Sequence, residues 1–222
     1  MKIGFIVPTE MENIGVPQSL TKAGYGPGKA AGCAAAADLV FRQNCDIVVL
    51  WGLAGGLADD ARVGDFYVVT EGAYRDFDYS GLLPCKLGYV PGYVDDGAFT
   101  KVTPSLVDAL HSAMTAVFPE KNVKRGTICT GDQIVHHPSK DDYNRIERKA
   151  ELVDMEFAAV QQFCNTLKRD GVNVDVCCVR AVSDNADHAV GASIKDFLDE
   201  FHRMNASLPA LARELAARLA NG

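Results

Sequence analysis

A cation, a hydroxyl and a carboxylate stand together at the end of one strongly apolar stretch of the chain. Residues 176–184 read VCCVRAVSD, in which an uncharged, β-branched run leads into Arg180, Ser183 and Asp184. Such a run is typical of a fully buried strand in a parallel sheet. In open α/β sheets ligands bind at the carboxyl ends of the strands, so these polar side chains lie where a site is expected. A structural ion pair at a strand end is the alternative.

Two further carboxylates follow other predicted strands. Glu12 comes shortly after an apolar run at residues 2–7, and Glu156 comes shortly after a brief run at residues 152–153. Because the carboxyl ends of parallel strands lie at one edge of a sheet, we expect these acids to share one cleft with Arg180 and Asp184.

This combination of side chains suits acid/base chemistry. The chain has neither a GxSxG nucleophile elbow nor a CxxC redox pair, and carboxylates without such a nucleophile can cleave an activated bond. Cleaving a glycosidic bond needs an acid on the leaving group and a base on water. A purine leaving group would take the proton on a ring nitrogen.

A glycine-rich segment, GLAGGL at residues 52–57, follows the strand predicted at residues 46–51. Glycines at such a point let the backbone approach a ligand closely, and a tight turn that needs positive φ is the other interpretation. The segment matches neither the dinucleotide fingerprint nor a P-loop.

Strands and helices alternate along the chain, which predicts an α/β fold with a mostly parallel sheet covered on both faces. The carboxylate-rich residues 9–13 are expected to form a turn, and one long amphipathic helix is expected to close the chain. The predicted strands are residues 2–7, 46–51, 65–70 (continuing towards Tyr74), 125–130, 152–153 and 176–184, and the predicted helices include residues 29–43, 103–117 and a segment from 156 to about 171.

Composition narrows the class of protein. The chain has 222 residues, 48% of them hydrophobic, and a net charge of -7. We expect a single domain over residues 1–222, with no nucleic-acid or membrane partner, because basic residues are scattered and no apolar run approaches a membrane span. The start of the chain lacks the features of a signal peptide, so a cytoplasmic location is expected.

The cysteines and histidines indicate no metal site. Seven cysteines, an odd number, occur without CxxC spacing, so we expect free thiols in a reducing compartment. The adjacent pair His136 and His137 is expected to be solvated in a loop, and neither a metal nor another cofactor is expected.

Six segments of the chain together resemble methylthioadenosine/S-adenosylhomocysteine nucleosidases, which belong to the purine nucleoside phosphorylase superfamily. They are MKIGFIVPTEMEN, VVLWGLAGGL, VGDFYVV, ICTGDQIV, VDMEFAAV and VRAVSDNAD. The resemblance covers nearly the whole chain, and the combination of DMEFAAV with VRAVSDNAD is specific. It implies a three-layer α/β/α fold with a twisted, mixed and mostly parallel central sheet. It also implies hydrolysis of the N-glycosidic bond of a 5′-substituted adenosine, with release of adenine.

The resemblance assigns the catalytic roles. Asp184 would protonate N7 of the adenine and hydrogen-bond its 6-amino group, supported by Ser183. Glu12 would activate the attacking water, with Arg180 helping to position it, and Glu10 is the fallback for this base.

The resemblance also assigns substrate contacts. Glu156 would bind the ribose hydroxyls while Met155 packs against the sugar. Val135 would offer backbone hydrogen bonds to the base, and Ile134 would pack on its face. Two more substrate-binding positions are expected in the glycine-rich segment, at Leu53 and Gly55.

Three positions depart from the family pattern. Ile134 replaces an aromatic residue on the purine face, which weakens stacking. Leu53 replaces a serine, which removes a polar contact near the water. The segment between Asn13 and Gly24 is much shorter than in the family, by about one hairpin, so the pocket for the 5′ substituent is expected to differ.

Water is the expected nucleophile, because phosphorolysis needs cations for the phosphate dianion. The residues just before the glycine-rich segment, Val49 to Trp51, are apolar, and the glutamates after the first strand would repel phosphate. A purine nucleoside phosphorylase is the competing interpretation of the same residues.

The substrate and the class of protein are also open at the level of the sequence. A nucleosidase for an aminofutalosine- or adenosylhopane-type nucleoside would use the same residues. A nucleoside-binding protein with weak catalysis and a scaffold in which the acids form ordinary ion pairs are hypotheses from two different classes. The resemblance further implies a homodimer, in which a partner residue closes the pocket.

Overall fold

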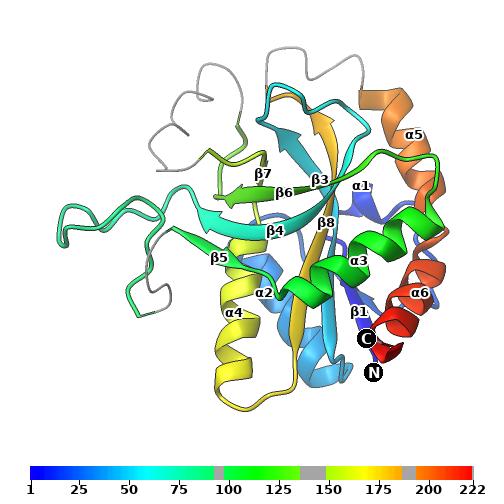
Figure 1. Ribbon diagram of the computed structural model, residues 1–222, viewed down its shortest axis with the longest axis horizontal. Coiled ribbons are helices and arrows are strands. Elements are labelled where there is room, and N and C mark those ends of the chain that lie inside the picture. Colours follow the sequence, from blue (N-terminus) through cyan, green and yellow to red (C-terminus); the bar gives the residue numbers. More distant parts are fainter. Residues whose placement is uncertain (93–97, 136–148, 187–193, 222) are drawn as a thin grey trace.

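One mixed sheet connects all the strands of the computed structural model, which describes residues 1–92, 98–135, 149–186 and 194–221 (Figure 1). The strand order is β2-β1-β3-β7-β6-β4-β5, and β8 pairs with both β3 and β4. The strands are β1 (Ile3–Ile6), β2 (Lys22–Ala23), β3 (Ile47–Gly56), β4 (Phe66–Tyr74), β5 (Phe99–Lys101), β6 (Val123–Thr130), β7 (Leu152–Asp154) and β8 (Asp175–Asp184).

The strand pairing closes a ring. β3 pairs with β7, β7 with β6, β6 with β4, β4 with β8, and β8 returns to β3. Most of the pairs in the sheet are parallel, while β3–β7, β4–β5 and β4–β8 are antiparallel. The prediction of a mixed, mostly parallel central sheet is therefore confirmed.

Helices cover both faces of this sheet, as Figure 1 shows. Helices α2 and α4 pack together on one face, and α3 packs with α6 on the other, where α5 also contacts β8. The helices are α1 (Glu10–Asn13), α2 (Lys29–Ala37) with its π-helical continuation η1 (Asp38–Arg42), α3 (Pro104–Val117), α4 (Phe157–Arg169), α5 (Ile194–Asn205) and α6 (Leu208–Asn221). No described helix has the length and apolar character needed to cross a membrane. The division of residues 1–222 into a single domain stays a prediction.

The first turn and the glycine-rich segment differ from the expected structure. Where a turn was expected at residues 9–13, Glu10–Asn13 form a short helix, α1, because its N-cap Thr9 and Glu12 make a reciprocal capping box. The strand predicted at residues 46–51 continues as β3 to Gly56, which excludes the alternative interpretation of the glycine-rich segment as a tight turn. The shortened segment after Asn13 contains no strand before Lys22.

The closing helix is broken in two. α5 ends at Asn205 and α6 begins at Leu208. Pro209 lacks an amide hydrogen and is tolerated in the first turn of a helix but not in its interior, which explains the break. Pro104 likewise starts α3, although the Thr103 side chain makes no capping hydrogen bond. Two sequence patterns that are typical of helix capping boxes, at residues 139–142 and 193–196, lie outside the residues whose side chains are described.

The core on the α3/α5 side centres on Trp51, the only tryptophan, which is fully buried. Its ring stacks on Phe66, Phe118 and Phe201, with centroids 5.7–6.0 Å apart. Offset stacking of buried aromatic rings adds to the free energy gained by burying their area. Trp51 therefore fixes β3, the strand that carries the glycine-rich segment, against the helices behind it.

All seven cysteines are unpaired in the structure, and among them Cys33 and Cys85 alone are partly exposed. Burial raises the pKa of the Cys177 and Cys178 thiols, which disfavours their reactive thiolate form. The predicted reducing, cytoplasmic setting stays a prediction.

We expect a thiol-reactive dye to modify Cys33 and Cys85 in the native protein and the other five cysteines only after unfolding. The measurement is a thiol titration without reductant, with and without denaturant. Fewer than seven thiols in denaturant would show that a disulfide has formed.

Candidate active site

The expected site residues gather around one pocket of about 380 Å³ at the ends of β3, β7 and β8. Arg180 alone among them does not line it, because its side chain is fully buried below the pocket surface. The expected residues that line the pocket are Glu12, Leu53, Gly55, Ile134, Val135, Met155, Glu156, Ser183 and Asp184. The expectation that the acids share one cleft is therefore confirmed.

Glu12 is held rigidly by hydrogen bonds to both of its carboxylate oxygens. Thr9 donates to Oε2 from its backbone N–H (3.0 Å) and its hydroxyl (2.6 Å), while the backbone N–H of Leu53 donates to Oε1 (2.8 Å). Glu12 is 5% exposed. Leu53 therefore supplies a polar contact through its backbone, although its side chain lacks the hydroxyl of the serine expected there.

Arg180 is a buried cation between carboxylates. Its Nη2 donates to Asp154 (2.6 Å) and to Glu156 (2.8 Å), and its Nε donates to Asp154 (3.2 Å). Its Nη1 has no hydrogen-bond partner among the described residues. A Cβ on Gly52 would lie 2.6 Å from this Nη1 and 2.4 Å from Oε1 of Glu12. The free N–H groups of Arg180 and the Glu12 carboxylate therefore meet over a glycine that cannot be replaced without a clash.

Asp154 belongs to the site, although the sequence pattern alone assigned it no role. Its Oδ2 accepts hydrogen bonds from Arg180 and from the Phe157 N–H (3.0 Å), and its Oδ1 accepts one from the Thr130 hydroxyl (2.5 Å). The signal that could have found Asp154 is its place directly after a predicted strand and two residues before Glu156.

Glu156 directly precedes α4, and its side chain reaches the start of α2. Its Oε1 accepts a hydrogen bond from the Gly28 N–H (2.9 Å), and its Oε2 accepts one from Arg180. Burial raises the pKa of Glu156 to about 7, although Arg180 acts in the opposite direction. The nearby carboxylates of Asp154 and Glu12 raise it further.

Asp184 ends β8 beside Gly55, where an added Cβ would lie 3.4 Å from its Oδ1. The Ser183 hydroxyl lies 2.8 Å from Oδ2 of Asp184, and the Ala186 N–H donates to Oδ1 (2.8 Å). Asp184 is half-buried at the pocket wall. These contacts fix the direction of the carboxyl group, as expected for a group that must meet a substrate at one atom.

Apolar side chains form much of the remaining wall. Val135 is buried, whereas Ile134 is 77% exposed at the pocket edge. Five further apolar lining residues were not predicted: Met11 from α1, Pro27 before α2, Ala54 from β3, Val153 from β7 and Leu198 from α5. They come from segments far apart in the sequence, so no local pattern pointed to them.

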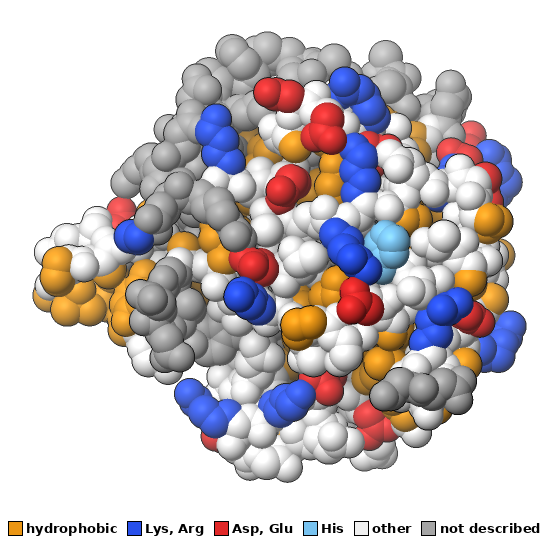
Figure 2. Space-filling model, in the orientation of Figure 1, with side chains coloured by type: hydrophobic (Ala, Val, Ile, Leu, Met, Phe, Trp, Pro, Cys, Tyr) orange, Lys and Arg blue, Asp and Glu red, His pale blue; other side chains and the backbone are white. Residues whose placement is uncertain are grey.

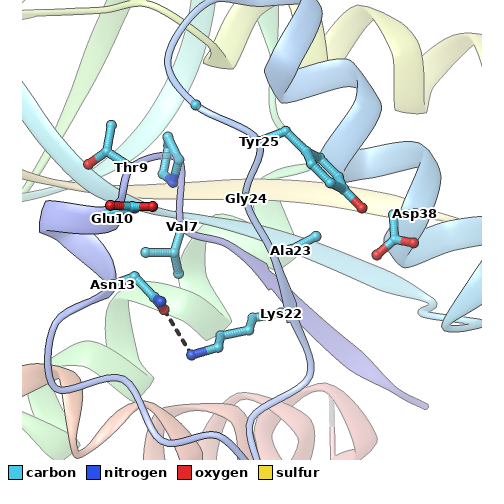
Figure 3. Close-up of a pocket in the computed structure, with 11 residues that line it drawn as sticks. Val7, Thr9, Glu10, Asn13, Lys22, Ala23, Gly24, Tyr25 and Asp38 are labelled. Carbon is cyan, nitrogen blue, oxygen red and sulfur yellow. Dashed lines mark hydrogen bonds between the residues drawn. The ribbon is translucent and has the colours of Figure 1, made fainter.

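A larger cavity of about 640 Å³ lies on the other side of α1 (Figure 3). Glu10, exposed to solvent, lines it together with Tyr25 and Asp38, and Lys22 donates to Asn13 there (2.8 Å). None of the ten expected site residues lines this cavity. Of the two glutamates, Glu12 alone therefore lines the pocket that holds Glu156 and Asp184.

Within the described residues, no group of three or more His, Cys, Asp or Glu side chains is arranged to hold a metal ion. The pair His136 and His137 lies outside the described residues.

We predict that replacing Glu156 by Gln changes the pH dependence of stability. Because its pKa is higher in the folded protein than its ordinary value of 4.5, protonation of Glu156 favours folding at low pH, and this contribution is lost as the pH rises through about 7. The free energy of unfolding of Glu156→Gln, minus that of the parent, should therefore rise with pH by roughly 1 kcal/mol per pH unit between about pH 5 and pH 7. Urea denaturation across this range measures it, and a constant difference would contradict the prediction.

The chain is similar in sequence to a known protein family and to several of its members. Residues 7–217 match the model of the phosphorylase superfamily. A 5′-methylthioadenosine/S-adenosylhomocysteine nucleosidase from Actinobacillus succinogenes is 31% identical over 202 residues, which are 89% of this chain and 80% of the relative. An aminodeoxyfutalosine nucleosidase from Helicobacter pylori is 29% identical over 175 residues, which are 78% of this chain and 70% of the relative.

Solved structures agree with the fold. A futalosine hydrolase of Helicobacter pylori superposes with a TM-score of 0.80 at 23% identity, over 96% of this chain and 98% of the other. A methylthioadenosine/S-adenosylhomocysteine nucleosidase of the same species gives a TM-score of 0.77 at 24% identity, over 100% and 99%. The expected fold and the resemblance are both confirmed, and the chain belongs to the phosphorylase superfamily.

Proposed function

We propose that this protein hydrolyses the N-glycosidic bond of a 5′-substituted adenosine of the methylthioadenosine/S-adenosylhomocysteine class and releases adenine. The expected enzyme class, an N-glycosidic bond hydrolase, is confirmed by the nucleosidase relatives. The observation that carries the proposal is that a fixed carboxyl group, Asp184, and a buried carboxylate with an adjacent cation, Glu12 with Arg180, serve the same pocket.

Asp184 is the proposed general acid. Adenine leaves poorly as an anion, so protonation of its N7 lowers the barrier to breaking the bond between C1′ and N9. Ser183 and the Ala186 N–H hold the two oxygens of Asp184. The carboxyl group gives its proton to N7 as the bonding electrons pass to the base, which leaves as neutral adenine.

Glu12 is the proposed general base. Its Oε1 faces Gly52 beside Nη1 of Arg180, so a water held between a carboxylate and a cation could attack C1′ of the ribose. Glu12 takes the proton of this water as the new C–O bond forms. Arg180 donates to the water oxygen through its remaining N–H groups.

Glu156 and Met155 are the proposed ribose contacts. Glu156 lies at the pocket wall with Oε2 on Arg180 and Oε1 on the Gly28 N–H. Each carboxylate oxygen has a second lone pair that can accept a ribose hydroxyl. Val135 and Ile134 line the same pocket as Asp184, which supports their proposed contact with the base.

The charges around the pocket favour water over phosphate as the nucleophile. Arg180 is surrounded by the carboxylates of Asp154, Glu156 and Glu12. The first N–H groups of α2, which could otherwise bind an anion, donate instead to Glu156 and to Asp132. A phosphate dianion would therefore meet repulsion from several carboxylates in the described part of the pocket.

The 5′ substituent is proposed to be apolar next to the ribose. Met11, Pro27 and Leu198 line the pocket, and such side chains suit an alkylthio group better than a charged one. The second candidate is an aminofutalosine-type nucleoside, which is favoured by the aminodeoxyfutalosine nucleosidase relative. Adenine release from methylthioadenosine, S-adenosylhomocysteine and aminofutalosine, with and without phosphate, distinguishes these substrates and separates hydrolysis from phosphorolysis.

We also propose that the protein acts as a homodimer. The segment around residues 75–92 projects from the body of the molecule, and apolar side chains gather on it at the left of Figure 2. On this segment Leu82 is 77% exposed, and Tyr79 and Leu83 are each 40% exposed. An apolar projection of this kind is typical of a surface that packs against another chain.

The proposed homodimer can be tested by measuring the mass of the protein in solution. Sedimentation equilibrium should give twice the mass of the 23.9 kDa chain, and Leu82→Asp should weaken the dimer because it places a charge in an apolar contact. Phe41→Asp, at an exposed apolar residue outside the segment, is the matched control and should leave the mass unchanged. A parent that stays monomeric at micromolar concentration would contradict the proposal.

The catalytic assignment predicts the effect of removing the acid or the base. Asp184→Asn keeps the shape but cannot transfer a proton, so kcat should fall about 10²–10⁴-fold, the usual range for general acid catalysis. Glu12→Gln should reduce kcat comparably, because the amide cannot accept a proton from water.

Both variants should keep the thermal midpoint near that of the parent and should still bind adenine. Glu10→Gln, which alters the other cavity, is the matched control and should keep its rate. Turnover of Asp184→Asn close to that of the parent on every nucleoside the parent cleaves would refute the assignment of the acid.

A further inference from the structure

The helix that carries Glu12 cannot hold its own position. α1 has four residues, and a helix this short leaves nearly all of its carbonyl groups without intrahelical partners. Its capping box satisfies N–H groups at the start of the helix but none of its carbonyl groups. Its place relative to the rest of the site must therefore come from contacts with another element.

That element is α5, far along the chain. The Asn205 side-chain amide donates from Nδ2 to the carbonyl oxygens of Glu12 and Ile14, both at 2.8 Å. The imidazole Nε2 of His202 lies 2.9 Å from the Met11 carbonyl oxygen. A Cβ on Gly15 would lie 2.1 Å from the carbonyl oxygen of His202, so the chain after α1 is pressed directly against α5.

Asn205 also contacts the strand on the other side of the catalytic base. The indole N–H of Trp51 donates to Oδ1 of Asn205 at 2.7 Å. Both residues are 0% exposed. Trp51 precedes Gly52 and Leu53 in β3, and the Leu53 N–H is the donor that holds Oε1 of Glu12. One buried amide thus connects the main chain of Glu12 to the strand that binds the Glu12 side chain.

We propose that Asn205 is a positioning residue for the water-activating base: it sets the distance between α1 and β3, and so holds the Glu12 carboxylate over Gly52 beside Arg180. This inference rests on the proposed function, because it assumes that Glu12 is the base. It adds a role for a residue outside the pocket and outside the family motifs on which the catalytic assignments rest.

The chemistry of the amide explains why asparagine suits this position. The site offers one donor, the Trp51 indole, and two acceptors, the carbonyls of Glu12 and Ile14. A primary amide satisfies all of them with one oxygen and two hydrogens. An aspartate would keep the acceptor for Trp51 but would place a carboxylate oxygen against two carbonyl oxygens.

Two variants test separately the hydrogen bonds of Asn205 to α1 and its hydrogen bond to Trp51. Asn205→Asp removes the donors to α1, and Trp51→Phe removes the donor to Asn205 while keeping a buried ring. With 5′-methylthioadenosine as substrate, we expect Asn205→Asp to lower kcat about 10²-fold, since a displacement of about 1 Å in a catalytic group can have this effect. We expect Trp51→Phe to lower kcat less, because the amide keeps both of its bonds to α1. KM should change little in either variant, because Asp184, Val135 and Met155 lie elsewhere in the pocket.

The control is Leu211→Ala in α6, a fully buried core residue that destabilises the fold without altering a hydrogen bond to α1. We expect it to lower the thermal midpoint at least as much as Asn205→Asp but to leave kcat close to that of the parent, at a temperature where all variants are folded. A folded Asn205→Asp with kcat close to that of the parent, or a Leu211→Ala that loses kcat equally, would overturn the positioning role.

A crystal structure of Asn205→Asp tests the role of Asn205 independently of whether the proposed function is correct. We expect Oε1 of Glu12 to have left the Leu53 N–H, and an unchanged contact would overturn the inference even if the parent cleaves every nucleoside in the panel. A parent that cleaves none of them would instead refute the proposed function, while the structure of the variant would still decide the role of Asn205.

Discussion

A fully buried guanidinium is the constraint around which the rest of the site is built. Arg180 sits in the middle of the closed ring of strands, and an unpaired charge there would destabilise the fold by several kcal/mol. Asp154 and Glu156 compensate for it from one side. Both Nε and Nη2 bind the same oxygen of Asp154, so the guanidinium is turned to leave Nη1 facing Glu12. The same ion pairs that compensate the buried charge of Arg180 leave the N–H groups of its Nη1 directed at the site.

The ion pair of Arg180 with Asp154 also connects β6, β7 and the start of α4. Asp154 can reach Arg180 only because β7 lies beside β3 in the ring, and Thr130 from β6 holds its second oxygen. The same carboxylate accepts the Phe157 N–H, and Thr130 accepts the Ala158 N–H, so the two residues together satisfy the first turn of α4. The start of that helix, the sheet and the buried cation therefore form one hydrogen-bonded unit.

Excess negative charge in this unit has a chemical consequence. Three carboxylates share one arginine, and the pKa of Glu156 is raised to about 7 as a result of burial and of its acidic neighbours. Such a site repels anionic nucleophiles and accommodates a neutral nucleoside and water. The preference for hydrolysis thus follows from the same charge balance that fixes Arg180.

The sequence by itself determined the fold class, most of the strands and many of the groups at the pocket, although it missed Asp154. Apolar runs that end in polar residues, such as residues 176–184, carry this information locally because a buried strand must be apolar along its whole length. The position of Glu12 after such a run likewise placed it at the edge of the sheet where the site was expected. The family resemblance supplied the roles that chemistry alone left open.

Only the tertiary structure decided which carboxylate pairs with Arg180, that β3 runs through the glycines, and how α1 is held. Each of these depends on residues far apart in the chain: Asp154 on Arg180, Gly52 beneath Glu12, and Asn205 on the Glu12 carbonyl. Hydrogen bonds between distant segments leave no periodic pattern in a sequence, because they are set by strand order and by helix packing rather than by local conformation. No local pattern marks Asn205 at the end of α5, because its partners Trp51 and α1 come together only in the fold.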